Sequence, residues 1–253
     1  MLMTNIRKGT QKHRKLLIIV VIILGAGMVS TFATWNSNYG ASSSSDDPTT
    51  TDYIEMYEGA IKDNTPAEGQ QIDYSTASTL AQDYKYLSSY YNKASDENKS
   101  TDEDLANQYL TKSTESITKA AEYYQLAIDN APENLNNLGL AQLYANKAAA
   151  LFSVGTASEE VRADYQKAYA LAPDNWDIAY SYSQFILVND GLEKATAFLT
   201  EYKSSLPEGS TTGTTVDQVI EYYKSLSQSD DSTESQDNTT SGDTSSGTDS
   251  TSN

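Results

Sequence analysis

A phrase of eleven residues occurs twice in this chain, first at Tyr124 and again at Tyr165, an offset of 41 residues. Both copies have the frame Tyr-Gln-x-Ala-x-x-x-Ala-Pro-x-Asn, and a fainter third copy runs from Leu199 to Gly209. Each copy ends an amphipathic segment at a proline, which cannot continue a helix and disfavours helical geometry in the residue before it. Repetition at this period predicts an array of helical units, each packed against the next.

Apolar residues recur at helical spacing on both sides of the repeated phrase, which predicts an all-α domain over residues 52–226. Ser100-Thr-Asp-Glu103 has the form of a capping box and is expected to open the longest helix, and Asn175 is expected to cap a later one. The expected helices cover residues 53–63, 75–93, 135–152, 157–171, 176–189, 192–205 and 214–226, and the longest one runs from the capping box at Ser100 to about residue 129.

The small and aromatic residues before each proline resemble the tetratricopeptide repeat, a helix pair of 34 residues. Ala120, Tyr124 and Ala127 match the pattern fully, and Val161, Tyr165 and Ala168 match it nearly. The resemblance covers about residues 75–209 and implies a right-handed α-solenoid of about three helix pairs. Helices 53–63 and 214–226 are expected to flank the pairs as caps, although helix 53–63 also fits the degenerate second helix of a further unit.

In that family, the first helix of each unit contributes to a concave groove that takes a peptide or a partner helix. The resemblance therefore implies a candidate groove on the first helices of two units. Its residues are Asn136, Gly139, Leu143 and Asn146, followed by Asp177, Tyr180, Gln184 and Leu187. The close-packing position of the first helices falls on Gln142 and Ser183, where these helices depart from the family pattern.

The stretch from Leu16 to Trp35 contains no charged residue and is long enough to cross the hydrocarbon core of a bilayer as a helix. A basic segment, residues 1–15, precedes it, so the positive-inside rule places the N-terminus in the cytoplasm and the remainder outside. The alternative is a signal peptide cleaved near Thr31-Phe-Ala33, which would release a secreted protein. Residues 36–51 are expected to form a flexible linker, and residues 227–253 a disordered tail rich in Ser, Thr and Asp.

Charge and composition exclude several functions. Beyond residue 45 the chain has 12 Lys and Arg against 35 Asp and Glu, and this balance of −23 opposes nucleic-acid binding. Cysteine is absent and the only histidine is His13, which argues against thiolate or imidazole metal sites and nucleophilic triads. No cofactor or metal is expected. Of the 18 tyrosines after residue 50, most fit core positions, whereas Tyr86, Tyr90 and Tyr222 are expected to face outward.

Three functions are compatible with the sequence. The first is a membrane-anchored binding scaffold for a protein or peptide, displayed on the extracytoplasmic side of a bacterial cell membrane. The second is a self-associating structural element of the cell envelope, and therefore a homo-oligomer. The third is an enzyme, for which the only motif is Ser116-Ile-Thr-Lys119, and the further motifs of penicillin-recognising enzymes are missing.

Overall fold

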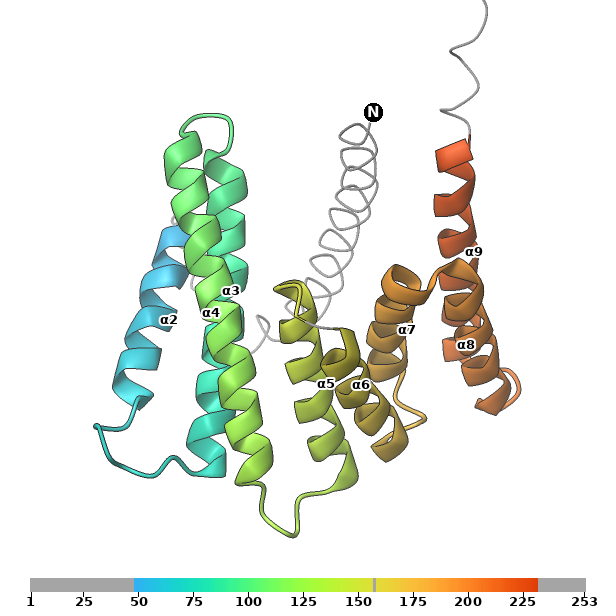
Figure 1. Cartoon of the computed structure of the whole chain (residues 1–253), viewed down its shortest axis with the longest axis horizontal. Helices are drawn as coiled ribbons and strands as arrows, with labels where there is room; N and C mark the ends of the chain where they lie inside the picture. The colour runs from blue at the N-terminus through green and yellow to red at the C-terminus, as the bar shows by residue number, and fades with distance from the viewer. Residues whose placement is uncertain (1–47, 157, 232–253) are drawn as a thin grey trace, which may run out of the picture.

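The structure is a computed structural model that describes residues 48–156 and 158–231, and all regular secondary structure in these residues is α-helical (Figure 1). The helix α2 spans Thr50–Asn64, and α3 and α4, the two longest, form a hairpin. The other helices follow with short connections. Their bounds are Tyr74–Asn98 for α3, Glu103–Asp129 for α4, Asn137–Ser153 for α5, Ser158–Leu171 for α6, Trp176–Asp190 for α7, Leu192–Ser205 for α8 and Thr211–Asp231 for α9.

Helices that follow each other in the chain also lie next to each other in space, from α2 at one end to α9 at the other (Figure 1). The helix α3 packs against α4, α5 against α6, and α7 against α8, and the second helix of each pair contacts the first helix of the next. The helices α5 and α7 also contact each other directly. This pattern confirms the all-α class and gives an elongated row of helices rather than a closed bundle.

Side-chain caps fix where several helices begin. Thr49 and Asp52 form a capping box at the start of α2, so the last residues assigned to the linker belong to the folded domain. The predicted capping box at Ser100 is wrong, because the cap of α4 is Asp102, whose carboxylate accepts a hydrogen bond from the Leu105 amide at 2.9 Å. The predicted cap at Asn175 is confirmed by a hydrogen bond from the Ile178 amide at 3.1 Å.

Two helices also extend beyond their predicted C-terminal ends. The helix α3 continues to Asn98 rather than ending near residue 93, because Ala94 is buried and the Ser95 hydroxyl donates a hydrogen bond to the Ala106 carbonyl of α4. The helix α9 continues to Asp231, so the first five residues of the predicted tail are helical. The prediction that Tyr90 faces outward is wrong as well, since its ring lies in the core between Tyr53 and Tyr57 of α2.

The core lies in successive clusters along the row, in which buried alanines and tyrosines pack with Leu, Ile, Val and Phe side chains. Tyr124 and Tyr165, the first residues of the two repeated phrases, are both about 1% exposed. Small side chains let the helix backbones approach closely, and the aromatic rings fill the space between the helices. The alanines with no exposed surface are Ala77, Ala81, Ala120, Ala127, Ala141, Ala148, Ala168, Ala179 and Ala195.

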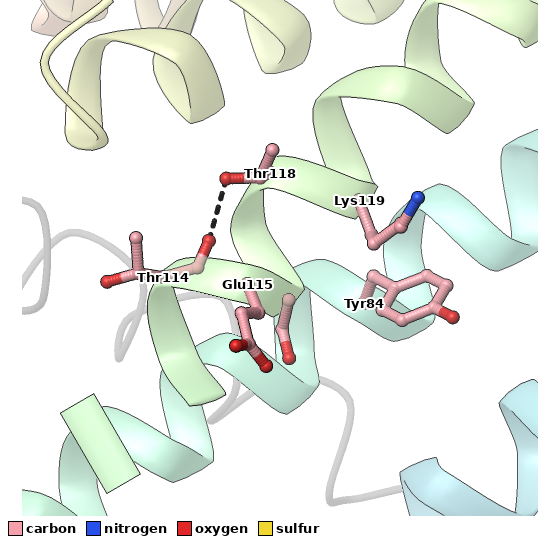
Figure 2. A pocket seen from close by; sticks show the side chains of 6 residues that line it. Tyr84, Thr114, Glu115, Thr118 and Lys119 are labelled. Carbon is pink, nitrogen blue, oxygen red and sulfur yellow. Dashed lines mark hydrogen bonds between the residues drawn. The ribbon is translucent and has the colours of Figure 1, made fainter. Parts of the chain in front are cut away.

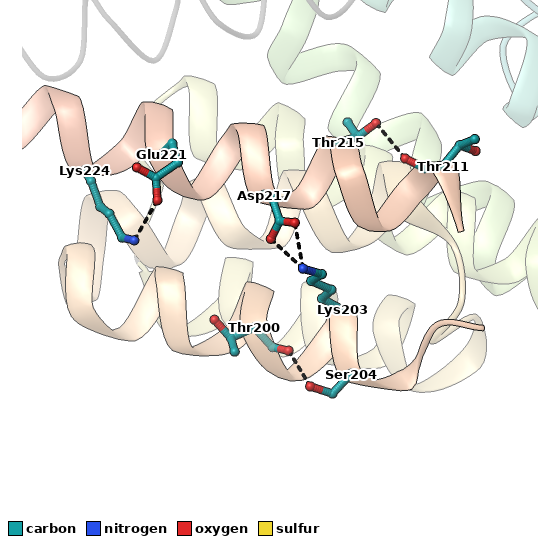
Figure 3. Close-up of polar contacts among 8 residues, drawn as sticks. All are labelled: Thr200, Lys203, Ser204, Thr211, Thr215, Asp217, Glu221 and Lys224. Carbon is teal, nitrogen blue, oxygen red and sulfur yellow. Dashed lines mark hydrogen bonds and ion pairs between the residues drawn. The ribbon is translucent and has the colours of Figure 1, made fainter. Parts of the chain in front are cut away.

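Ion pairs join neighbouring helices. Lys147 of α5 is buried and its Nζ lies 2.9 Å from Asp164 Oδ2 of α6, with Glu160 Oε1 at 3.2 Å. Arg162 of α6 makes a bidentate pair with Asp190 at the end of α7, at 2.8 and 3.0 Å. At the exposed end of the row, Lys203 of α8 contacts both carboxylate oxygens of Asp217 of α9 (Figure 3).

The predicted membrane span at residues 16–35 lies outside the described residues, as do residues 1–15, most of the linker and the tail from residue 232. Within the described part, none of the helices has the length and apolar character needed to cross a bilayer.

Replacement of Lys147 by Met should lower the free energy of unfolding by about 3–5 kcal/mol, because it leaves the Asp164 carboxylate buried without a cation. The double variant Lys147→Met/Asp164→Leu should recover most of that loss, since no buried charge remains. Urea unfolding of the purified full chain, followed by far-UV circular dichroism, measures both changes.

The matched control is Lys119→Met, which removes an ion pair between two exposed side chains, Lys119 and Glu122. This variant should change stability by less than about 1 kcal/mol. Equal effects of the two lysine substitutions would contradict the structural role given to Lys147.

Candidate functional site

The helices α3, α5, α7 and α9 form one layer of the row, and a side-chain contact joins each to the next. Lys85 of α3 donates a hydrogen bond to Asn146 Oδ1 of α5 at 2.9 Å. Phe152 of α5 lies edge-on to Phe185 of α7, with ring centroids 5.5 Å apart. The layer is completed by Ser183 of α7, whose hydroxyl lies 3.0 Å from the hydroxyl of Tyr223 in α9. The first helices that were predicted to carry the groove are therefore neighbours.

The four groove residues predicted around α5 have different environments. The side chain of Asn136 caps the helix by accepting a hydrogen bond from the Gly139 amide at 2.7 Å. Leu143 is buried in the cluster that joins α5 to α3 and α4, so it belongs to the core. Asn146 is half-buried against Lys85. These residues hold α5 in place, and they do not form one exposed stripe.

Substitution of Gly139 by a larger residue is also not a clean test of the predicted groove. A Cβ atom at this position would lie 3.0 Å from Leu135 Cδ1 and 3.3 Å from the Asn136 cap oxygen. A larger residue would therefore displace the cap and the loop before α5, and a loss of binding could come from that disturbance.

The four groove residues predicted on α7 lie closer to the expected arrangement. Asp177 is exposed, and Tyr180 and Leu187 are partly exposed. Gln184, however, is 3% exposed and its Nε2 has no hydrogen-bond partner. The helix α9 lies against α7 at the adjacent Ser183, a contact between segments 40 residues apart in the sequence. The structure thus leaves Asp177, Tyr180 and Leu187 accessible and removes Gln184 from the surface.

On α5 the exposed stripe is displaced by one residue from the predicted one. Leu138 is 44% exposed and Gln142 is exposed, and their spacing of four places them on the same helix face. Ala141, which has no exposed surface, takes the close-packed position that the repeat pattern assigned to Gln142. The signal for this shift lies in the sequence: Asn136 is a strong N-cap residue, and Ala141, Ala145 and Ala148 mark a small-residue face.

Aromatic side chains are also exposed or partly exposed on α7 and α9. Trp176 stacks on Tyr180, with ring centroids 5.4 Å apart, and Tyr222 of α9 is 42% exposed. Burial raises the pKa of Tyr180, and the nearby Tyr222 hydroxyl raises it further. Such side chains offer large contact areas at a low entropic cost, as in many protein interfaces. We define the open face as Leu138, Gln142, Asp177, Tyr180 and Tyr222.

Lys85 lies beside the open face, in the contact between α3 and α5. Burial lowers the pKa of its ammonium group, and Asn146 is its hydrogen-bonding partner. A neutral amide compensates a desolvated ammonium group only in part, which is why the pKa of Lys85 stays lowered.

The two residues of the Ser-x-x-Lys motif line a shallow hollow of about 460 Å³ on α4, together with Tyr84 of α3 (Figure 2). Ser116 is 5% exposed, whereas Lys119 is an exposed residue that lies beside Tyr84 and pairs with Glu122 Oε2 at 2.6 Å. That hydrogen bond is the main reason why the pKa of Lys119 is raised. A lysine that activates a serine must be neutral and within hydrogen-bonding distance of it. On α4 the Lys119 ammonium group is instead paired with Glu122, and the raised pKa keeps it charged.

Residues 48–156 and 158–231 contain no group of three or more His, Asp or Glu side chains placed to share a metal ion. Comparison of the sequence with protein-family models gave no match, and comparisons with curated proteins and with solved structures gave none either.

The one-residue displacement on α5 can be tested with a pair of adjacent leucine substitutions. Ala141→Leu forces a large side chain into a position with no free surface and should cost about 1–3 kcal/mol of unfolding free energy. Gln142→Leu lies on the open face and should change stability by less than about 0.5 kcal/mol. Thermal or urea unfolding measures the stability of the two variants. A larger loss of stability in Gln142→Leu than in Ala141→Leu would support the alignment inferred from the repeat pattern.

Proposed function

We propose that this protein is a membrane-anchored binding scaffold of the tetratricopeptide type, which captures a protein or peptide on its open face. The helix pairs would form a right-handed α-solenoid, with α3, α5, α7 and α9 as the layer that meets the partner. The observation that supports this most directly is the exposed apolar and aromatic surface on that layer, with Leu138 44% and Tyr222 42% exposed.

The charge of the domain indicates what kind of partner fits. The chain beyond residue 45 has a balance of −23, and Asp177 lies within the open face. A partner with an apolar surface and basic residues at its margin would be attracted over a distance and then bury Leu138 and the tyrosines. An amphipathic helix or an extended peptide with that composition is the best candidate.

The proposed location follows from the segment between Leu16 and Trp35. As an uncleaved span it would keep residues 1–15 in the cytoplasm and place the helical domain outside. The enzyme alternative depends on the Ser116-Ile-Thr-Lys119 motif, whose lysine pairs with Glu122, and we therefore favour the binding scaffold.

The orientation can be tested by proteolysis of cells whose inner membrane is intact. An external protease should remove the domain after residue 36 and leave a short membrane-bound fragment that contains the N-terminus. Protection of the whole chain would contradict the proposed orientation, and release of the domain without protease would favour signal cleavage.

The open face is tested with Leu138→Asp, for which the chain offers a matched control. Leu110→Asp changes the same residue type at 50% exposure, on α4 outside the proposed layer. A photo-crosslinking residue at Gln142 should capture the partner in intact cells. Leu138→Asp should reduce the yield of this adduct by about tenfold, the effect of removing one strong interface contact, and Leu110→Asp should leave it unchanged.

Circular dichroism of both variants controls for folding. The proposal fails if both substitutions, or neither, reduce the yield. If the captured species is a second copy of this chain, and the purified protein is a stable oligomer, the open face serves self-association instead.

A further inference from the structure

A second hollow, distinct from the open face, lies between α2 and α3. Its volume is about 230 Å³, several times the 30 Å³ or so that one water molecule occupies in the liquid. Three tyrosines contribute to its lining, Tyr57 of α2 and Tyr74 and Tyr86 of α3, and the rings of Tyr57 and Tyr86 are 5.5 Å apart. The remaining lining includes Ser78 and Asp83 of α3.

Two polar atoms in the lining of this hollow lack a hydrogen-bond partner. The Oδ2 atom of Asp83 and the Oγ atom of Ser78 are both buried and form no hydrogen bond. None of the ion pairs in the described part of the chain includes Asp83. A carboxylate oxygen that is removed from water and has no cation beside it is unfavourable, so a cation that entered the hollow would relieve this cost.

The electrostatics of the neighbouring groups agree with this interpretation. Burial raises the pKa of the Asp83 carboxyl group, and a hydrogen bond from the Asn64 side chain offsets the effect only in part. Burial also raises the pKa of Tyr57, and the charge of Asp83 contributes to that increase. The Tyr57 ring therefore remains neutral and can present its electron-rich face to a cation.

We propose that this hollow binds a primary ammonium group at the end of an apolar chain, as in a lysine side chain presented by a partner protein. The carboxylate of Asp83 supplies the opposite charge, the tyrosines surround the methylene groups, and the hydroxyl of Ser78 accepts a hydrogen bond from the ammonium group. An inorganic cation would leave the aromatic walls unused, and a guanidinium group is planar and wider than the terminus of a methylene chain.

The test uses Nα-acetyl-lysine N-methylamide as the probe and the norleucine analogue, which has no charge, as its matched control. Saturation-transfer NMR with the purified full chain should give a signal on the terminal methylene protons of the lysine probe. The lysine probe should bind about tenfold more tightly than the norleucine analogue. Equal affinity of the two probes would overturn the proposal.

Two variants assign the binding to this hollow. Asp83→Asn keeps the shape of the side chain, removes an uncompensated charge and should weaken binding of the lysine probe by about tenfold. Asp96→Asn is the matched control, because Asp96 is an exposed carboxylate on the same helix. Ser78→Leu should fill the hollow and abolish binding, which provides a second test if the Asp83 variant does not fold.

Unchanged affinity in a folded Asp83→Asn variant, or in Ser78→Leu, contradicts the proposal. Competition by an equal concentration of potassium chloride would assign the hollow to an inorganic cation and also overturn it. Comparison with n-butylammonium distinguishes the source of the ligand: tighter binding of the acetylated lysine indicates a side chain within a peptide. This experiment requires no partner protein, so its outcome is independent of the test of the open face.

Discussion

Close contact between alanine faces is the interaction on which the rest of this structure depends. Each of the helices from α3 to α8 contributes at least one alanine that has no exposed surface. An alanine allows two helix backbones to approach closely, and a longer side chain at such a position would separate them. The repeated phrase therefore determines how the helices pack. Its alanines let helices approach closely, and its tyrosine fills the volume that remains beside them. The open face proposed for partner binding is a surface that this packing leaves free.

Polar contacts add specificity to this packing. Alanine faces are smooth and nearly equivalent, so they do not by themselves determine how far one helix is displaced along the next. The Lys147–Asp164 pair and the bidentate Arg162–Asp190 pair fix α5 against α6 and α6 against α7. A displaced helix would leave these charges buried and unpaired, which is costly. The Lys85–Asn146 hydrogen bond joins α3 to α5 in the same way.

Most of the fold could be predicted from the sequence, because prolines, caps and helical periodicity are local signals. The prolines at 132, 173 and 207 end the second helices, and all eight expected helices have counterparts among the described residues. The errors have different causes. The end of α3 has the composition of a polar loop, but its contact with Ala106 extends the helix. On α5 the cause is local, because the Asn136 cap and the buried Ala141 place Leu138 and Gln142, rather than Gly139 and Leu143, on the exposed stripe. Gln184 was placed on the surface because its burial beside α9 depends on a contact between distant segments.

The buried tyrosines limit the pH range in which the fold is stable. Burial raises the pKa of Tyr90 to about 12 and shifts Tyr124, Tyr165 and Tyr223 in the same direction. A tyrosine in the unfolded chain ionises near pH 10, whereas the same group in the folded chain resists ionisation. The unfolded state therefore binds fewer protons in this range, and stability falls as the pH rises above that value. Because such tyrosines lie near both ends of the row, in α3 and α9, as well as in α4 and α6 between them, alkaline conditions should destabilise several helix contacts rather than open one end.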